Sequence, residues 1–244
     1  MPKPWKSILF VGLCLLLILY FSISSQLELP ASSGPYTVGR TVFQWVDSSR
    51  PEVLTEDPND LREVIVMIWY PAEAGTGIRT GYFPNLPSVS DVLVQSGEVK
   101  WWEAFGLRFI RSESLLDATP VNVEHPFPVV IFSPGNGTNI EFYSSLASEI
   151  ASHGYVVVGV NHPYDVPAVP LSSGEIAPYD KDQWILSIEE HQAYTTERVK
   201  VRVTDLLYVL DELDEMNSRG PFAGFMDLVS VAVAGHSLGG ITAS

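Results

Sequence analysis

Cysteine is almost absent from this chain. Cys14 is the only one among 244 residues, and it lies inside an apolar run near the N-terminus. A single thiol can form neither an internal disulfide nor a metal site built from several thiolates. The five histidines also show no spacing of the His-Glu-x-x-His kind, which zinc enzymes use. We therefore expect no metal and no other cofactor.

Positive charge is scarce as well. Lys and Arg total 14 against 29 Asp and Glu, which gives a formal net charge of −15. An acidic body of this kind repels nucleic acid and anionic lipid headgroups, so we expect no nucleic-acid partner. Hydrophobic residues make up 46% and charged residues 18%. This balance is typical of a globular protein with a substantial core.

The first residues, 1–24, form a segment of their own. Lys3 and Lys6 precede an apolar run from Ile8 to Ile23. A positive start followed by such a run is typical of a signal peptide or of an N-terminal membrane anchor, and both alternatives stay open. Either one predicts that the body, 25–244, is exported. The body would then be membrane-anchored by this segment, or secreted or periplasmic after cleavage.

The body alternates between strand-like and helical patterns. We expect strands at residues 36–46, 61–70, 128–132 and 155–160 and from about 228 onward. We expect helices at about 140–152 and 186–216. In the second helix, the apolar residues at helical spacing are Val199, Val203, Leu206, Leu207, Leu210 and Leu213. Buried strands that alternate with helices predict an α/β fold, a mostly parallel sheet with helices on both faces.

Residues 74–127 are predicted to form an irregular, cap-like insertion with helices near 88–95 and 100–111. Its apolar cluster comprises Trp101, Trp102, Phe105, Leu107, Phe109 and Ile110. These side chains could belong to a cap over an active site that touches lipid, or they could pack internally. Internal packing is the favoured interpretation because large apolar side chains are usually buried.

The most informative motif stands close to the end of the sequence. An apolar strand runs into Gly235-His236-Ser237-Leu238-Gly239, which fits Gly-x-Ser-x-Gly. In a nucleophile elbow, a sharp strand-to-helix turn lifts a serine hydroxyl above the sheet, and the flanking glycines leave room for that turn. Ser237 is therefore the candidate nucleophile. The alternative is a Gly-rich turn that carries an inert serine.

Acyl transfer by serine also needs N–H donors for the developing oxyanion. The backbone N–H of Leu238, directly after the candidate nucleophile, is one candidate. The second donor should come from a loop that follows an earlier strand, and here that loop is 133–137, Ser-Pro-Gly-Asn-Gly. Its glycines let the amides turn toward the site, and the N–H of Asn136 is our candidate.

No upstream residue completes a catalytic triad well. His236 adjoins Ser237, but the elbow points neighbouring side chains apart. His162 and Asp165 follow a strand at the edge where ligands bind. This topology places them two strands away, so we expect a supporting role in the pocket wall. Enzymes with this elbow supply the acid and the histidine after the serine, and we expect neither the triad Asp nor the triad His in this chain.

Several short motifs, taken in order, resemble a known family. They are Gly34-Pro35-Tyr36, Trp69-Tyr70-Pro71, the run 128–135, the run 151–157 and the elbow. Together they resemble the platelet-activating factor acetylhydrolase family, of the plasma and isoform II type, with its bacterial dienelactone hydrolase-like relatives. The resemblance covers most of the chain after about residue 34.

The resemblance implies an α/β-hydrolase fold, incomplete after the elbow, with a metal-free Ser-Asp-His triad. It also implies hydrolysis of short or oxidised acyl chains from phospholipids, while relatives cleave other small esters. Ser237 matches the nucleophile of the family, and the N–H groups of Leu238 and Asn136 match its oxyanion hole. Pro134 departs from the family, which usually has His there, and Leu238 stands where Phe is common.

We therefore expect the N-terminal portion of a serine esterase that hydrolyses carboxylic esters through an acyl-enzyme on Ser237. The expected substrate is a short-chain or phospholipid-type ester. Two alternatives stay open: a hydrolase of lactones or other small esters, and a truncated, membrane-tethered protein without catalysis. We also expect the polypeptide as written to be inactive, since it lacks a base. The sequence does not indicate an oligomeric state.

Overall fold

The computed structural model describes residues 4–24, 29–97, 99–122 and 124–244. The helix α1 (Pro4–Ser24) comes first, and Lys3 of the predicted N-terminal segment lies outside the described residues. Across the described ranges, we find no helix with both the length and the apolar character that crossing a membrane requires. The signal peptide and the membrane anchor both stay predictions.

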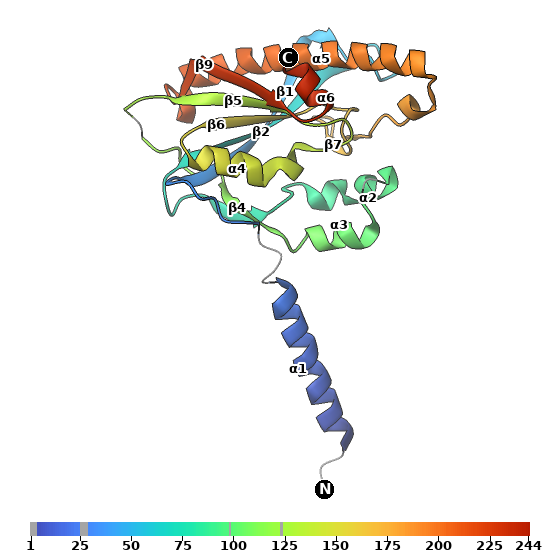
Figure 1. Cartoon of the computed structure of the whole chain (residues 1–244), viewed down its shortest axis with the longest axis vertical. Coiled ribbons are helices and arrows are strands. Elements are labelled where there is room, and N and C mark those ends of the chain that lie inside the picture. The colour runs from blue at the N-terminus through green and yellow to red at the C-terminus, as the bar shows by residue number, and fades with distance from the viewer. Residues whose placement is uncertain (1–3, 25–28, 98, 123) are drawn as a thin grey trace.

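Among the described residues, seven strands form one mixed sheet in the order β3-β4-β1-β2-β6-β5-β9 (Figure 1). They are β1 (Thr37–Pro51), β2 (Leu61–Ala72), β3 (Ile78–Gly81), β4 (Arg111–Leu116), β5 (Phe127–Ser133), β6 (Val156–Asn161) and β9 (Met226–Gly235). β6, β5 and β9 run parallel. β2 is antiparallel to β1 and to β6, β4 is parallel to β1, and β3 is antiparallel to β4. The elbow strand β9 thus lies at one edge, two strands from β6.

A short pair, β7 (Val169–Pro170) and β8 (Ile176–Ala177), forms a separate two-stranded sheet. The helices of the body are α2 (Leu86–Ser96), α3 (Trp101–Leu107), α4 (Ser144–Ser152), α5 (Ile188–Ser218) and α6 (Leu238–Thr242). Single 3₁₀ turns occupy η1 (Ile140–Tyr143), η2 (Asp182–Ile185) and η3 (Gly220–Phe222). α5 and α4 lie on opposite faces of the sheet (Figure 1).

The strand β6 shows how both faces of the sheet are filled. Val156 and Val158 point into the core beneath α5, where Val209 is fully buried. Val157, between them, points to the other face and packs with Ala147 of α4. Successive side chains of a strand alternate in direction, so a strand covered on both faces must be apolar at every position. The prediction of an α/β sheet covered by helices on both faces is confirmed.

The insertion 74–127 contains strands that the sequence did not indicate. β3 and β4 extend the main sheet at the edge far from β9. β4 includes Ser112 and Ser114, which are buried and hydrogen-bond to each other. Without an apolar alternation, β4 gives no strand signal. The helix expected over 100–111 ends at Leu107, and the prediction is wrong beyond that residue.

The aromatic side chains of α3 and of the turn after it are mostly exposed. Trp101 is 68% exposed, Trp102 52%, Phe105 55% and Phe109 43%. Within the cluster predicted from the sequence, only Leu107 and Ile110 pack against the small core around α2. Internal packing, the favoured interpretation, is wrong for these four aromatic residues. They form an apolar surface patch, the α3 aromatic patch.

The buried face of α5 differs from the apolar stripe read from the sequence. Val203 is 38% exposed and Leu207 57% exposed. Arg202 and Asp205 are fully buried instead, on the same helix face as Val209. The stripe that faces the sheet therefore contains charged residues toward its N-terminal half, next to the candidate site.

Candidate active site

The backbone at Ser237 has the strained geometry of a nucleophile elbow. Its φ is 52° and its ψ is −118°, a region that residues other than glycine rarely occupy. A Cβ on Gly235 would come within 2.2 Å of the Gly239 carbonyl carbon, and one on Gly239 within 2.0 Å of the Ser133 oxygen. Both glycines are thus required by the turn, and the Ser237 side chain is exposed above it.

The loop 133–137 lies directly against this elbow. Ser133 pairs with Gly235 at the ends of β5 and β9. The backbone N–H of His236 donates to the Ser133 carbonyl at 3.1 Å. The structure therefore brings together the three predicted site residues, with Ser237 and Leu238 on one segment and Asn136 on its neighbour. Their catalytic roles stay predictions.

The two predicted oxyanion donors are available. Among the described residues, neither the Asn136 nor the Leu238 backbone N–H donates a hydrogen bond to another protein group. Backbone N–H groups without a protein partner can stabilise a developing negative charge, provided that their positions are fixed before the reaction.

His236 points away from the nucleophile. Its Nδ1 lies 2.9 Å from the Tyr143 hydroxyl, which also accepts a 3.2 Å hydrogen bond from the Gly135 N–H. The side chain thus links the elbow to the loop 133–137. None of the described histidines is hydrogen-bonded to the Ser237 hydroxyl. As expected from the sequence, His236 is a poor candidate for the base.

His162 lies in a buried chain of hydrogen bonds that has the order Ser-His-Asp. Its Nε2 is 3.0 Å from the Ser133 Oγ, and its Nδ1 is 2.8 Å from the Asp205 Oδ2. Ser133, His162 and Asp205 are all 0% exposed, so no substrate can reach this serine. Asp205 is also paired with Arg62, at 2.7 Å and 3.1 Å. The chain supports the loop and is not a second triad.

Burial lowers the pKa of His162 to about 4, although the hydrogen bond to Asp205 opposes this shift. His162 is therefore neutral at pH 7. Its Nδ1–H donates to Asp205, and its Nε2 accepts from the Ser133 hydroxyl. Burial opposes the ionisation of Asp205 as well, but Arg62 outweighs it and holds the pKa of that carboxyl well below its usual range.

Asp165 supports the same loop from another direction. It pairs with Arg198 at 2.6 Å and with Arg202 at 2.8 Å. Burial opposes its ionisation, but these two guanidinium groups hold the pKa of Asp165 below its usual range. Arg202 also donates to the Pro134 carbonyl at 2.8 Å, and the Gly137 N–H donates to the Asp165 carbonyl at 2.8 Å.

Sequence reasoning identified His162 and Asp165 as supporting residues but missed Arg62, Arg202 and Asp205. Arg202 and Asp205 are three residues apart on α5, so they share a helix face. That face continues at Val209 and Leu213, four residues apart, and these two side chains are buried. The sequence signal for a buried ion-pair site was a pair of charged residues, Arg202 and Asp205, at helical spacing with the apolar residues Val209 and Leu213.

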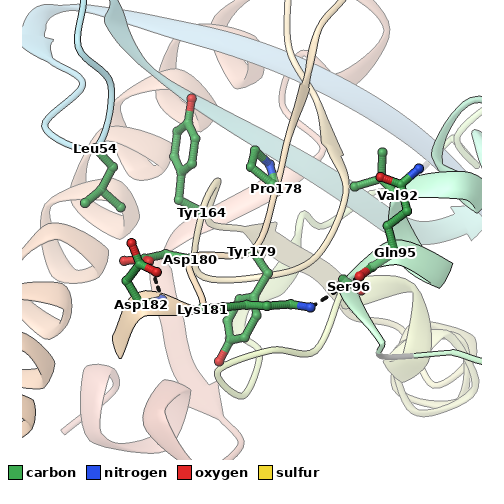
Figure 2. A pocket seen from close by; sticks show the side chains of 10 residues that line it. All are labelled: Leu54, Val92, Gln95, Ser96, Tyr164, Pro178, Tyr179, Asp180, Lys181 and Asp182. Atoms are coloured by element: carbon green, nitrogen blue, oxygen red, sulfur yellow. Dashed lines mark hydrogen bonds between the residues drawn. The ribbon is translucent and has the colours of Figure 1, made fainter. Parts of the chain in front are cut away.

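A pocket of about 580 Å³ lies beside the site but does not include the elbow. Figure 2 shows the pocket between α2 and the segment 178–182. At its wall, the Lys181 amine donates a hydrogen bond to the Gln95 carbonyl at 3.3 Å. Its wall reaches the loop 133–137 indirectly. The Asp180 carbonyl accepts from the Gln183 side chain, which in turn accepts from the Asn136 side chain at 2.7 Å.

Comparison with known proteins agrees with this geometry. A ferulic acid esterase from Streptomyces cinnamoneus superposes with a TM-score of 0.70 at 28% identity, over 88% of this chain and 56% of that one. The fold and the elbow define a serine-type α/β-hydrolase. The model of the family "Platelet-activating factor acetylhydrolase, isoform II" matches residues 21–244. The chain belongs to this family.

Two curated relatives show the extent of the match. A probable 1-alkyl-2-acetylglycerophosphocholine esterase from Arthroderma benhamiae is 30% identical over 174 residues, covering 64% of this chain and 42% of the relative. A platelet-activating factor acetylhydrolase from Cavia porcellus is 25% identical over 238 residues, covering 88% of this chain and 51% of the relative. The chain thus spans about half the length of the curated relatives that it matches.

Proposed function

We propose that the protein is a serine hydrolase of carboxylic esters that forms an acyl-enzyme on Ser237. One observation carries the proposal: the Ser237 backbone has elbow geometry directly beside a loop whose Asn136 N–H is free. Membership of a family named for an acetylhydrolase supports it.

In the proposed reaction, the Ser237 Oγ attacks the carbonyl carbon of the ester. The N–H groups of Asn136 and Leu238 stabilise the oxyanion, and the bond to the leaving alcohol oxygen then breaks. Water hydrolyses the acyl-enzyme and releases the acid. A base must take the Ser237 proton and pass it to the alcohol. Among the described histidines, none is hydrogen-bonded to the Ser237 hydroxyl, and the proposal assigns no base and no acid partner.

The proposed substrate is a phospholipid-type ester with a short acyl chain. The names of the relatives, a probable 1-alkyl-2-acetylglycerophosphocholine esterase and a platelet-activating factor acetylhydrolase, support this class. The α3 aromatic patch also supports an amphiphilic substrate, since exposed Trp and Phe side chains favour the interface between lipid and water. The likeness to a ferulic acid esterase favours a second candidate, a small soluble ester.

Export of the protein is part of the same proposal. It is supported by Lys3 and Lys6 ahead of the apolar run 8–23. Fractionation of the producing cells, with N-terminal sequencing of the recovered protein, tests it. A full-length protein recovered from the cytoplasm would contradict export.

The test of the reaction uses the full-length protein, meaning the product of the complete coding sequence, and its Ser237→Ala variant. Initial rates are compared on an acetyl glycerophosphocholine, on a p-nitrophenyl acetate and on a small lactone. We expect Ser237→Ala to lower turnover by about 1,000-fold or more, because no other group can carry the acyl intermediate. Ser230→Ala, an exposed serine on the same strand, is the matched control and should keep full activity. Undiminished turnover in Ser237→Ala would disprove the proposal.

A further inference from the structure

Each residue of the loop 133–137 makes a specific hydrogen bond to another part of the body, but the backbone N–H of Asn136 has no partner among the described residues. The contacts are Ser133 Oγ with His162 Nε2 at 3.0 Å, Pro134 O with Arg202 Nη1 at 2.8 Å, Gly135 N with Tyr143 Oη at 3.2 Å, Asn136 Nδ2 with Gln183 Oε1 at 2.7 Å, and Gly137 N with Asp165 O at 2.8 Å. The Asn136 backbone N–H donates to no protein group in the described chain. The loop is therefore anchored at every residue around this amide.

Two buried branches supply the contacts to Ser133 and Pro134. One runs from Ser133 through His162 to Asp205 and ends on Arg62, which also pairs with Glu52 at 2.7 Å. These five side chains come from β5, the residue after β6, α5, β2 and the residue after β1. Because the elements are far apart in sequence, only the folded body assembles this branch.

The second branch starts at the Pro134 carbonyl. It runs through Arg202 to Asp165, which also holds Arg198. Arg202 is 0% exposed and Asp165 1% exposed. The branch thus connects a single carbonyl oxygen of the loop to two ion pairs inside the protein.

Stability alone is a poor reason for such a network. Burying several charges costs desolvation energy that their mutual attraction repays only in part, and well-packed apolar residues in their place are often as stable. Directional contacts of buried charges can instead specify one arrangement of the groups that they join, and this network does so although Nη2 of Arg198 and of Arg202 has no hydrogen-bond partner among the described residues. Here the groups joined are the backbone atoms on both sides of the Asn136 amide.

The anchored loop also sets the position of the elbow. The Ser133 carbonyl accepts from the His236 N–H, and the Ser133 and Pro134 carbonyl oxygens would lie 2.0 Å and 2.6 Å from a Cβ on Gly239. Movement of either carbonyl would therefore move the elbow, or the amide of Asn136 relative to it.

We propose that Ser133, His162 and Arg202 are positioning residues that hold the Asn136 amide toward the carbonyl oxygen of the substrate at Ser237. The inference rests on the proposed ester hydrolysis and deepens it, because it assigns the buried charges a part in that reaction. An oxyanion donor is effective only when its position is fixed in advance, and a displacement on the order of 1 Å can cost about 100-fold in rate.

The test compares three variants of the full-length protein on p-nitrophenyl acetate. Ser133→Ala removes the bond to His162, and Arg202→Lys keeps the charge but cannot bond Asp165 and Pro134 with the same fork. Tyr70→Phe is the matched control, since it removes a buried hydrogen bond, 2.7 Å to the Ala118 carbonyl, away from the loop. The measurements are kcat, KM, the thermal midpoint and the inhibition constant of a trifluoromethyl ketone, which mimics the tetrahedral intermediate.

For Ser133→Ala and Arg202→Lys we expect kcat to fall about 10-fold or more with KM nearly unchanged, and the ketone to bind more weakly by a similar factor. Tyr70→Phe should lower the thermal midpoint but leave kcat and the inhibition constant unchanged. A network that only stabilises the fold would lower the midpoint in all three variants and leave kcat and ketone binding intact. That result would overturn the inference.

The same experiment separates this inference from the proposed function. Wild-type turnover that disappears in Ser237→Ala but persists unchanged in Ser133→Ala and Arg202→Lys would overturn the positioning role alone. A wild-type protein without ester turnover, or one whose turnover survives Ser237→Ala, would overturn the proposed function together with the positioning role.

Discussion

Acidification from pH 7 to pH 4 should weaken the folded protein through His162. Burial lowers the pKa of this histidine from an ordinary 6.5 to about 4. Between these two values the unfolded chain binds a proton that the folded protein does not bind. The free energy of unfolding therefore falls as the pH drops through this window, and the loss from His162 ends below about pH 4.

The size of the effect follows from the two pKa values. The difference between 6.5 and about 4, at about 1.4 kcal/mol for each pKa unit, gives a loss of about 3 kcal/mol. At the steepest point, the slope is about 1.4 kcal/mol per pH unit. A domain has a total stability of about 5–15 kcal/mol, so the loss is large enough to measure easily.

Other buried acids titrate differently and can be separated from His162. Asp165 and Asp205 have pKa values below their usual range, so their contributions are lost only below about pH 3.8. Burial raises the pKa of Glu141, which gives a slope of the opposite sign above pH 4.5. A His162→Gln variant removes the histidine alone, because glutamine can both donate and accept hydrogen bonds but does not titrate.

The assay is urea unfolding, followed by tryptophan fluorescence, of wild type and His162→Gln at several pH values from 4 to 7.5. The wild-type curve should lose about 3 kcal/mol more than the variant across this range. The comparison uses the slope of the free energy of unfolding against pH, so a loss of stability that is the same at every pH does not affect the result. Parallel curves for the two proteins, or a His162 NMR resonance that titrates near pH 6.5, would refute the reasoning.

Two further predictions concern the elbow and the core. Gly239→Ala should lower ester turnover about 100-fold, because the new Cβ would lie 2.0 Å from the Ser133 carbonyl oxygen. Gly240→Ala should keep most of the ester turnover, because the atom nearest to its new Cβ would lie 3.4 Å away. Initial rates check this pair, and equal losses in both variants would contradict it. Leu213→Ala should lower the free energy of unfolding by about 2–5 kcal/mol, because the Leu213 side chain is 0% exposed. Leu207→Ala should lower it little, because the Leu207 side chain is 57% exposed. Urea unfolding checks this pair, and similar losses would show that the assigned faces of α5 are wrong.

The elbow could be predicted because its requirements are local. Ser237 must adopt a positive φ, and Gly235 and Gly239 must stand where no Cβ fits. Such constraints act within a few residues and leave a pattern in the sequence. The central strands could be predicted for a similar reason, since a strand covered on both faces is apolar at nearly every position.

The support of the loop 133–137 could not be predicted in the same way. The sequence pattern assigns Arg202 and Asp205 to the polar side of α5, but both are buried in the structure. It assigns Val203 and Leu207 to the apolar side, but both are exposed. Ion pairs among Arg62, Asp205 and Asp165 and their partners let charged side chains occupy a face that patterning assigns to apolar ones.

The sequence by itself determined the elbow turn at Ser237, the loop 133–137 that precedes it, the central strands and long helices, and the family resemblance. These features depend on local backbone geometry and on the spacing of apolar residues. Only the tertiary structure decided which charges are buried, how His162 comes to be neutral and which atoms hold the Asn136 amide. Desolvation and pairing depend on groups brought together from β2, from the loop after β6 and from α5, and no local pattern along the chain records those contacts.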